Sequence, residues 1–276
     1  MKKFKTFKLS PQSLSPLLYL LLLLIFISCE TDQVSEEASQ SLTSNNSKAP
    51  NSSGKMNTFY GPAKQMGDGV LKSMVVMKHD GTPEAIGLRI SEKVLTGLPH
   101  EELNITLDLS SKMKGMAFDH IDFGWNPHGH EPPGIYDIPH FDIHFYMVSV
   151  DYKNTILDPA LIETPPDAKY IPEGYFTPGG LVPYMGEHWL DLNAAELQPG
   201  GVFTRTFIYG SYDQEFIFYE PMITLAYLQQ KGKEQIAIPQ PAEFQRTGLY
   251  YPTTYSINYD AVKKEYLITL ENLVLR

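Results

Sequence analysis

Histidines gather in one short stretch of this chain. Four of the eight histidines lie between His128 and His144. From Pro139 onward, polar and apolar residues alternate with period two, which predicts a strand with two different faces. The polar face would carry His140, Asp142 and His144. The apolar face would carry Phe141, Ile143 and Phe145. Imidazoles in line with a carboxylate, on a strand whose back is buried, can form a metal site or an acid–base site.

The spacing of these residues limits how they can bind an ion. A strand rises about 3.3 Å per residue, so residues four apart are about 13 Å apart. His140 and His144 therefore cannot share one ion on a regular strand, although each can pair with Asp142. The remaining ligands must come from loops. We predict as metal ligands His130, His140, His144 and His188. As accessory carboxylates we expect Glu131, Asp142 and Glu187.

Imidazole and carboxylate ligands without a thiolate suit a divalent transition metal, namely zinc, iron or manganese. In the alternative interpretation there is no cofactor, and the histidines form a buried polar network in a non-enzymatic envelope protein. The sequence leaves open whether the chain is an enzyme. We assign no role to His79, His100 and His120, which are expected in a turn, after a proline and on a surface strand. For His128, between Pro127 and Gly129, a solvated position and a place in the site both stay open.

Other residues near the histidines have structural interpretations. Glu220, before Pro221, is expected to be a buried acceptor for a loop N–H. Trp125 and Trp189 are expected to pack over the site and shield it. The sequence lacks a glycine-rich phosphate loop, a Gly-x-Ser-x-Gly turn and a His-Glu-x-x-His helix. Paired carboxylates for sugar hydrolysis remain compatible with it, and aromatic-rich loops suit a small-molecule or carbohydrate ligand.

Four segments of the chain resemble a bacterial family of exported proteins that is catalogued as a domain of unknown function. They are Gly129–Gly134 (GHEPPG), Pro139–Tyr146 (PHFDIHFY), Gly186–Trp189 (GEHW) and Glu220–Met222 (EPM). The resemblance implies an exported β-protein and no particular reaction. The pair His128 and His130, with His188, is also similar in outline to the cupin barrels, as an analogy of architecture only.

The N-terminus predicts export and a lipid anchor. Lysines at positions 2, 3, 5 and 8 precede an apolar run of about 11 residues, which is too short to span a membrane and fits a signal peptide. The run ends at Cys29, the only cysteine, in a pattern resembling a bacterial lipobox. We predict a signal peptide (1–28), a disordered tether (29–56) and a single β domain (57–276). Lipidated Cys29 would anchor the protein in the bacterial cell envelope, facing the periplasm or the cell surface.

Charge excludes one class of partner. Without residues 1–28 the chain carries 18 basic and 32 acidic residues. Such an acidic protein will not attract nucleic acid by electrostatics. The sequence does not indicate the oligomeric state.

Strand patterns dominate the rest of the chain. Alternation is clear at 70–77, 86–90 and 103–109, and further strands are expected at 202–209, 215–219, 223–228, 254–259 and 266–270. Single helical turns are expected at 159–162, 193–197 and 241–245. Two long ordered loops, 124–139 and 157–192, interrupt the pattern. We therefore predict an all-β fold, an antiparallel sandwich or barrel of jelly-roll or Greek-key type with little helix.

Overall fold

A computed structural model describes residues 56–276. The predicted signal peptide (1–28), Cys29 and all but the last residue of the predicted tether (29–56) lie outside the described residues. The strands are β1 (Met56–Tyr60), β2 (Lys64–Met66), β3 (Gly69–Lys78), β4 (Pro83–Ser91), β5 (Leu103–Asp108), β6 (His120–Asn126), β7 (His140–Tyr146), β8 (Tyr175–Phe176), β9 (Glu187–Asp191), β10 (Arg205–Tyr212), β11 (Glu215–Thr224), β12 (Lys233–Ala237), β13 (Tyr250–Tyr251), β14 (Thr254–Asp260), β15 (Glu265–Glu271) and β16 (Val274–Leu275). The helices are α1 (Val150–Lys153) and α2 (Leu225–Gln229), with single 3-10 turns at Glu92–Leu95, Pro159–Ile162, Ala168–Tyr170 and Ala195–Leu197.

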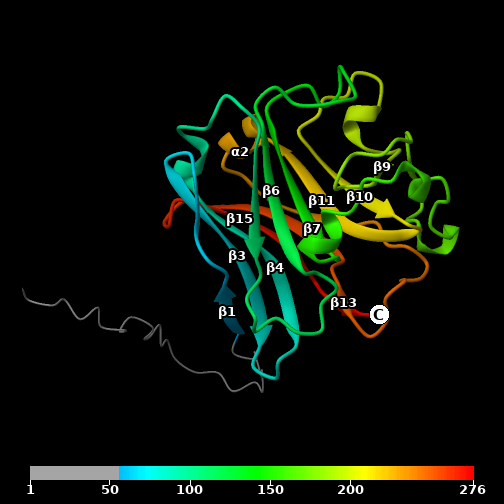
Figure 1. Ribbon diagram of the computed structural model, residues 1–276. Helices are drawn as coiled ribbons and strands as arrows, with labels where there is room; N and C mark the ends of the chain where they lie inside the picture. The colour runs from blue at the N-terminus through cyan, green and yellow to red at the C-terminus, as the bar shows by residue number, and fades with distance from the viewer. Residues whose placement is uncertain (1–55) are drawn as a thin grey trace, which may run out of the picture. The chain divides into compact units, whose positions relative to one another are not determined.

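Two antiparallel sheets face each other. Sheet A has the order β1-β3-β4-β15-β14-β12, with β2 beside β3, and sheet B has the order β5-β6-β7-β11-β10-β9-β8. The described part of the chain starts in sheet A, builds sheet B and returns to sheet A, so that β4 and β15 are neighbours (Figure 1). This arrangement confirms the predicted antiparallel sandwich.

The main core lies between the sheets, where the inner side chains of their strands pack together. The inner side chains of β7 are fully buried, as predicted: Phe141, Ile143 and Phe145. Opposite them, sheet A contributes the fully buried Leu88 and Ile268. The two sheets meet directly where the rings of Phe207 and Tyr255 lie 5.1 Å apart. Burial of this apolar surface is the main stabilising contribution.

The outer face of sheet B is also covered, since every residue of β7 is buried. Two smaller apolar clusters pack on this face, one around Tyr146 and Phe218 and the other around Leu190 and Met222. Loop residues of 135–138 and 148–185 complete them. Within residues 56–276, no helix is long and apolar enough to cross a membrane.

The structure corrects four sequence predictions. The expected helical turn at 241–245 is irregular, and the expected strand at 223–228 ends at Thr224, whose side chain caps α2 by accepting a hydrogen bond from Tyr227 N. The expected loop 157–192 contains β8 and β9. Pro221 does not interrupt β11, which runs through it in the middle of sheet B. Local sequence patterns do not predict where β8, β9 and β11 begin and end, because pairing with neighbouring strands determines these boundaries.

Candidate metal centre

Strand pairing places a row of polar side chains across the outer face of sheet B. On β6, Asp122 lies opposite His144 of β7, and on β11 Met222 lies opposite Asp142. Because side chains of one face recur every second residue, Glu220 lies beside His144. The neighbour of Glu220 on β10 is the apolar Ile208. The carboxylate of Glu220 is therefore next to β7, which carries His144, and has no polar neighbour on β10.

The first group of candidate ligands is His130, His140 and Asp142. His130 Nε2 lies 3.3 Å from Asp142 Oδ2, and His140 Nε2 lies 3.1 Å from Asp142 Oδ1. Asn126 donates a hydrogen bond of 2.7 Å to Asp142 Oδ2 and so fixes the carboxylate. His140 is fully buried, whereas His130 is partly exposed on its loop.

Backbone carbonyls fix the tautomers of both histidines in this group. The Nδ1–H of His130 donates to Glu131 O at 2.7 Å, and the Nδ1–H of His140 donates to Ile138 O at 2.6 Å. A carbonyl oxygen can only accept, so in each neutral ring the proton is on Nδ1 and Nε2 presents a lone pair. Histidines that bind metals are commonly oriented by such an outer hydrogen bond.

A tight turn brings His130 to the strand. His130 N donates to Tyr136 O at 3.1 Å, which folds loop 127–139 back over β7. Gly129 has φ +69°, and a Cβ there would lie 2.1 Å from Tyr136 O. Only glycine fits this position.

The second group of candidate ligands is His144, His188 and Glu220. Glu220 Oε2 lies 3.2 Å from His144 Nε2 and 3.8 Å from His188 Nε2. The carboxylate and His144 are almost completely buried, and His188 is 18% exposed. Three strands, β7, β9 and β11, each supply one ligand.

Phe218 packs against both histidines of the second group. Its ring lies 4.8 Å from the His144 ring and 5.5 Å from the His188 ring, measured between centroids. The ring occupies the space above Gly210, where a Cβ would lie 2.0 Å from it. Gly210 on β10 therefore allows β9 and β11 to bring His188 to Glu220.

The atoms at the centre of each group lack hydrogen-bond partners in the part of the chain that the structure describes. These buried atoms are His140 Nε2, Asp142 Oδ1, His144 Nε2 and Glu220 Oε2. Each unsatisfied buried polar atom is costly. Atoms bound to one ion at about 2.0–2.2 Å lie roughly 3–4 Å apart, which matches the separations in both groups. One cation in each group would satisfy all four atoms.

Electrostatics within the groups are strongly coupled. Burial acts to lower the pKa of His130, but its contact with the Asp142 carboxylate raises that pKa to about 9. Burial acts to raise the pKa of Asp142, but His130 and His140 hold it far below its usual range. For His144, the Glu220 carboxylate outweighs burial and raises the pKa, whereas burial lowers the pKa of His188. Both carboxylates thus attract positive charge.

Both groups open into one cavity of about 560 Å³. His130 and Asp142 line it from the first group, and His188 and Glu220 line it from the second. The cavity lies beneath loop residues 178–185, which cover this side of sheet B. Its floor is the polar row, and its walls are largely apolar.

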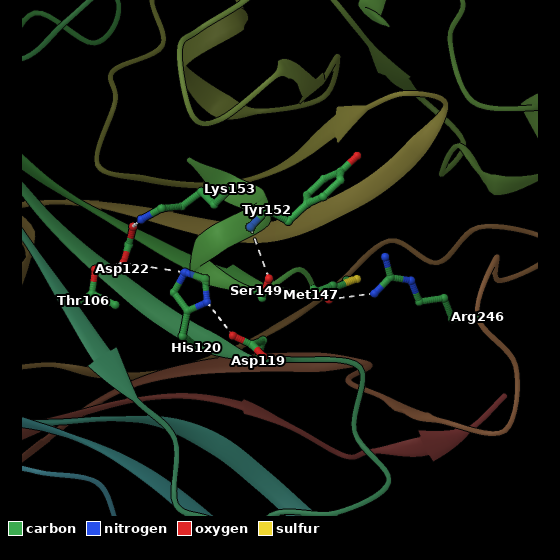
Figure 2. A network of polar contacts seen from close by, with 9 residues as sticks. All are labelled: Thr106, Asp119, His120, Asp122, Met147, Ser149, Tyr152, Lys153 and Arg246. Carbon is green, nitrogen blue, oxygen red and sulfur yellow. Dashed lines mark hydrogen bonds and ion pairs between the residues drawn. The ribbon is translucent and has the colours of Figure 1, made fainter. Parts of the chain in front are cut away.

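A third polar network adjoins the second group, at the other end of the row (Figure 2). Lys153 Nζ of α1 lies 2.5 Å from Asp122 Oδ2, and Thr106 donates a 2.6 Å hydrogen bond to Asp122 Oδ1. His120 contacts Asp119 at 3.0 Å and stacks on Tyr146 with ring centroids 4.9 Å apart. The expectation that His120 lies on a surface strand is wrong, because its ring is buried against Tyr146 and the residue is only 2% exposed.

The structure divides the predicted ligands into two sets. His130 and His140 belong to the first group and His144 and His188 to the second. Asp142 is a member of the first group; Glu131 lines the cavity and is not a member of either. Glu187 points to the face of Trp189, opposite to His188, because neighbours on a strand alternate. His128 is exposed and belongs to neither group.

Three aromatic or acidic residues are placed differently from expectation. Trp125 and Trp189 pack in the core between the sheets and do not shield the site. Glu220 is a central member of the second group, which the sequence interpretation did not assign. The available signal was a lone carboxylate within the apolar run FIFYEPMI, since a buried acid needs a partner.

Comparisons with family models, with curated proteins and with solved structures found no match to this chain. Functional inference therefore rests on the geometry of the site. The resemblance to an exported family stays a prediction.

Proposed function

We propose that the chain binds two divalent transition-metal ions, one in each histidine–histidine–carboxylate group on the outer face of sheet B. The observation that carries this proposal is the set of buried, unpartnered Nε2 and carboxylate atoms that converge at 3.1 Å and 3.2 Å. An Nε2 lone pair and a carboxylate oxygen at these distances repel each other unless a proton or a metal ion lies between them.

Zinc, iron and manganese fit this donor set. Each group supplies two imidazole nitrogens and one carboxylate, which leaves coordination positions for water or a ligand from the cavity. A bound ion of this kind supplies Lewis acidity and an activated water. The protein would orient the ligands through Asn126 and the two backbone carbonyls, and exclude bulk water with the covering loops.

A second candidate function has a specific observation in its favour. The pKa of His130 is raised to about 9, so at neutral pH its imidazolium can satisfy Asp142 without a metal. The groups would then form a structural network that holds loop 127–139 on β7. In the second group the raised pKa of His144 allows the same pairing with Glu220, whereas burial lowers the pKa of His188 and so favours a neutral ring with a lone pair for a metal.

The test is elemental analysis of a soluble chain, residues 30–276, which retains every described residue and is purified without a histidine tag. We expect two equivalents of metal after equilibration with zinc and dialysis. Asp142→Asn and Glu220→Gln should each retain one equivalent, and Glu131→Gln, at the cavity but outside both groups, should retain two. Absence of metal, with a melting temperature that neither zinc nor a chelator changes, would support the structural network.

We further propose that Cys29 is lipidated and anchors the protein in the bacterial cell envelope. The sole cysteine at the end of a short apolar run supports this. An exported protein acquires its metal outside the cytoplasm, where imidazole and carboxylate ligands remain suitable under oxidising conditions.

A further inference from the structure

The cavity above the two groups has the size of a ligand pocket. Its volume of about 560 Å³ lies within the range of roughly 300–1,000 Å³ that is typical for small-molecule sites. One side of it is the polar floor, where four residues of the two groups are accessible. The rest of the lining includes apolar residues, from the sheet beside this floor and from the loop over it: Leu181, Val182, Met185, Leu190, Ile208 and Met222.

The charges of the lining narrow the class of ligand. The described lining residues include four carboxylates, Glu102, Glu131, Asp142 and Glu220, and neither lysine nor arginine. Two divalent ions would balance these four negative charges. The balanced pocket accepts a neutral or monoanionic head group, whereas a phosphate ester or a dicarboxylate would add negative charge that no lysine or arginine of the lining offsets.

The hydrogen-bonding groups of the lining disfavour a ligand that is strongly polar away from its head group. Asn126 already donates to Asp142, and the Tyr136 hydroxyl donates to Glu196 at 3.2 Å. A carbohydrate would bury several hydroxyls against Leu190, Ile208 and Met222 without partners, which is unfavourable. An apolar body gains from the same surface.

We propose that this cavity binds a small molecule with an apolar body and a single metal-coordinating head group. The head would occupy the open coordination positions at the floor, and the body would lie between the sheet and loop 178–185. Gly179 and Gly180 line the cavity with their backbone, since they carry no side chain. Their φ angles of +80° and +96° lie in the left-handed region that favours glycine. This inference rests on the proposed function, since the metal ion would coordinate the head group of the ligand.

The experiment uses residues 30–276 loaded with cobalt and titrated with straight-chain hydroxamates, from acetohydroxamate to octanohydroxamate. The visible spectrum of cobalt reports binding at the metal. We expect the Kd to fall about fourfold per added methylene until the cavity is full, on the order of 100-fold in total. Metal-free protein should bind octanohydroxamate at least about tenfold more weakly.

Two variants separate the cavity from the metal. Leu181→Trp places a larger side chain in the cavity and should remove most of the chain-length gain without changing the cobalt content. Val262→Trp, at a position 93% exposed in the β14–β15 turn, should behave like the original protein.

Three results would overturn the inference. A Kd that does not change with chain length, at full cobalt content, would contradict the apolar cavity and leave the proposed function intact. If metal-free protein bound octanohydroxamate as tightly as cobalt-loaded protein does, the metal would not coordinate the head group. Absence of bound cobalt would overturn the proposed function and this inference together.

Discussion

At the scale of residues, the site depends on imidazole Nε2 atoms that lie next to carboxylate oxygens. In the first group, two Nδ1–H donors are committed to the carbonyl oxygens of Glu131 and Ile138, so both Nε2 atoms face Asp142. In the second group, Glu220 Oε2 faces two imidazoles. A proton or a metal ion has to lie between these atoms, and the two compete for the same positions.

This competition predicts a pH dependence for metal binding by the first group. Because the contact with Asp142 raises the pKa of His130 to about 9, the metal must displace a proton at any lower pH. The affinity of Glu220→Gln protein, which keeps only this group intact, should rise about tenfold per pH unit up to about pH 9. A chelator-competition titration across this range measures the slope. An affinity that is flat below pH 9 would contradict the assignment of His130 as a ligand.

Residue types alone could predict part of the site. The alternation in β7 predicts which side chains leave the core, and it separates His140 from His144 by their spacing. The partners of these residues come from β9 and β11, and the pairing of strands distant in sequence decides which side chains meet. The sequence pattern therefore indicates one histidine-rich region, and it does not indicate the division into two groups, the position of Glu220 or the burial of His120.

At the scale of elements, β7 is the central support of the site, buried on both faces between β6 and β11. Its inner face enters the sandwich core, and its outer face carries candidate ligands of both groups. The predicted fold class followed from alternation and turn residues. Strand boundaries near Pro221 and Gly210 could not be predicted, because both residues ordinarily mark interruptions.

Truncation of an inner side chain of β7 tests its role in the core. Phe145→Ala should lower the free energy of unfolding by about 3–5 kcal/mol, because Phe145 is fully buried and leaves a cavity. Val262→Ala, in an exposed turn, should change it by less than about 0.5 kcal/mol. Urea unfolding of residues 30–276 measures both. A loss below about 1 kcal/mol for Phe145→Ala would show that this face does not form the core.

The contact between α1 and β6 is a buried ion pair. Lys153→Met should lower the free energy of unfolding by about 3–5 kcal/mol, since it leaves the charge of Asp122 buried without its partner. The double variant Asp122→Asn, Lys153→Met removes both charges and should recover part of the loss. If the double variant were less stable than Lys153→Met, the two side chains would not be coupled as the 2.5 Å contact indicates.

At the scale of the whole molecule, a tethered sandwich would present its metal centre outside the membrane. Residues 56–276 hold both sheets and the cavity, whereas the proposed anchor lies outside the described residues. The N-terminal lysines, the short apolar run and the single cysteine predict export, and this prediction does not depend on the fold. The oligomeric state depends on surfaces whose partners no sequence pattern identifies.

Removal of the anchoring cysteine tests this organisation. Cys29→Ala should move the protein from the membrane fraction to the soluble fraction or leave it as an unprocessed precursor, because no acyl chain can be attached. Fractionation and mass spectrometry of the full chain distinguish these products. A mature Cys29→Ala protein that still requires detergent would contradict lipidation.

Anomalous diffraction from crystals of residues 30–276, equilibrated with zinc and measured at the zinc edge, locates the ions directly. We expect two anomalous peaks, each about 2.0–2.2 Å from its ligand atoms. One should lie among His130 Nε2, His140 Nε2 and an Asp142 oxygen, and the other among His144 Nε2, His188 Nε2 and Glu220 Oε2. Data that show neither peak, with Nε2 of His130 and His140 hydrogen-bonded to Asp142, would contradict metal binding.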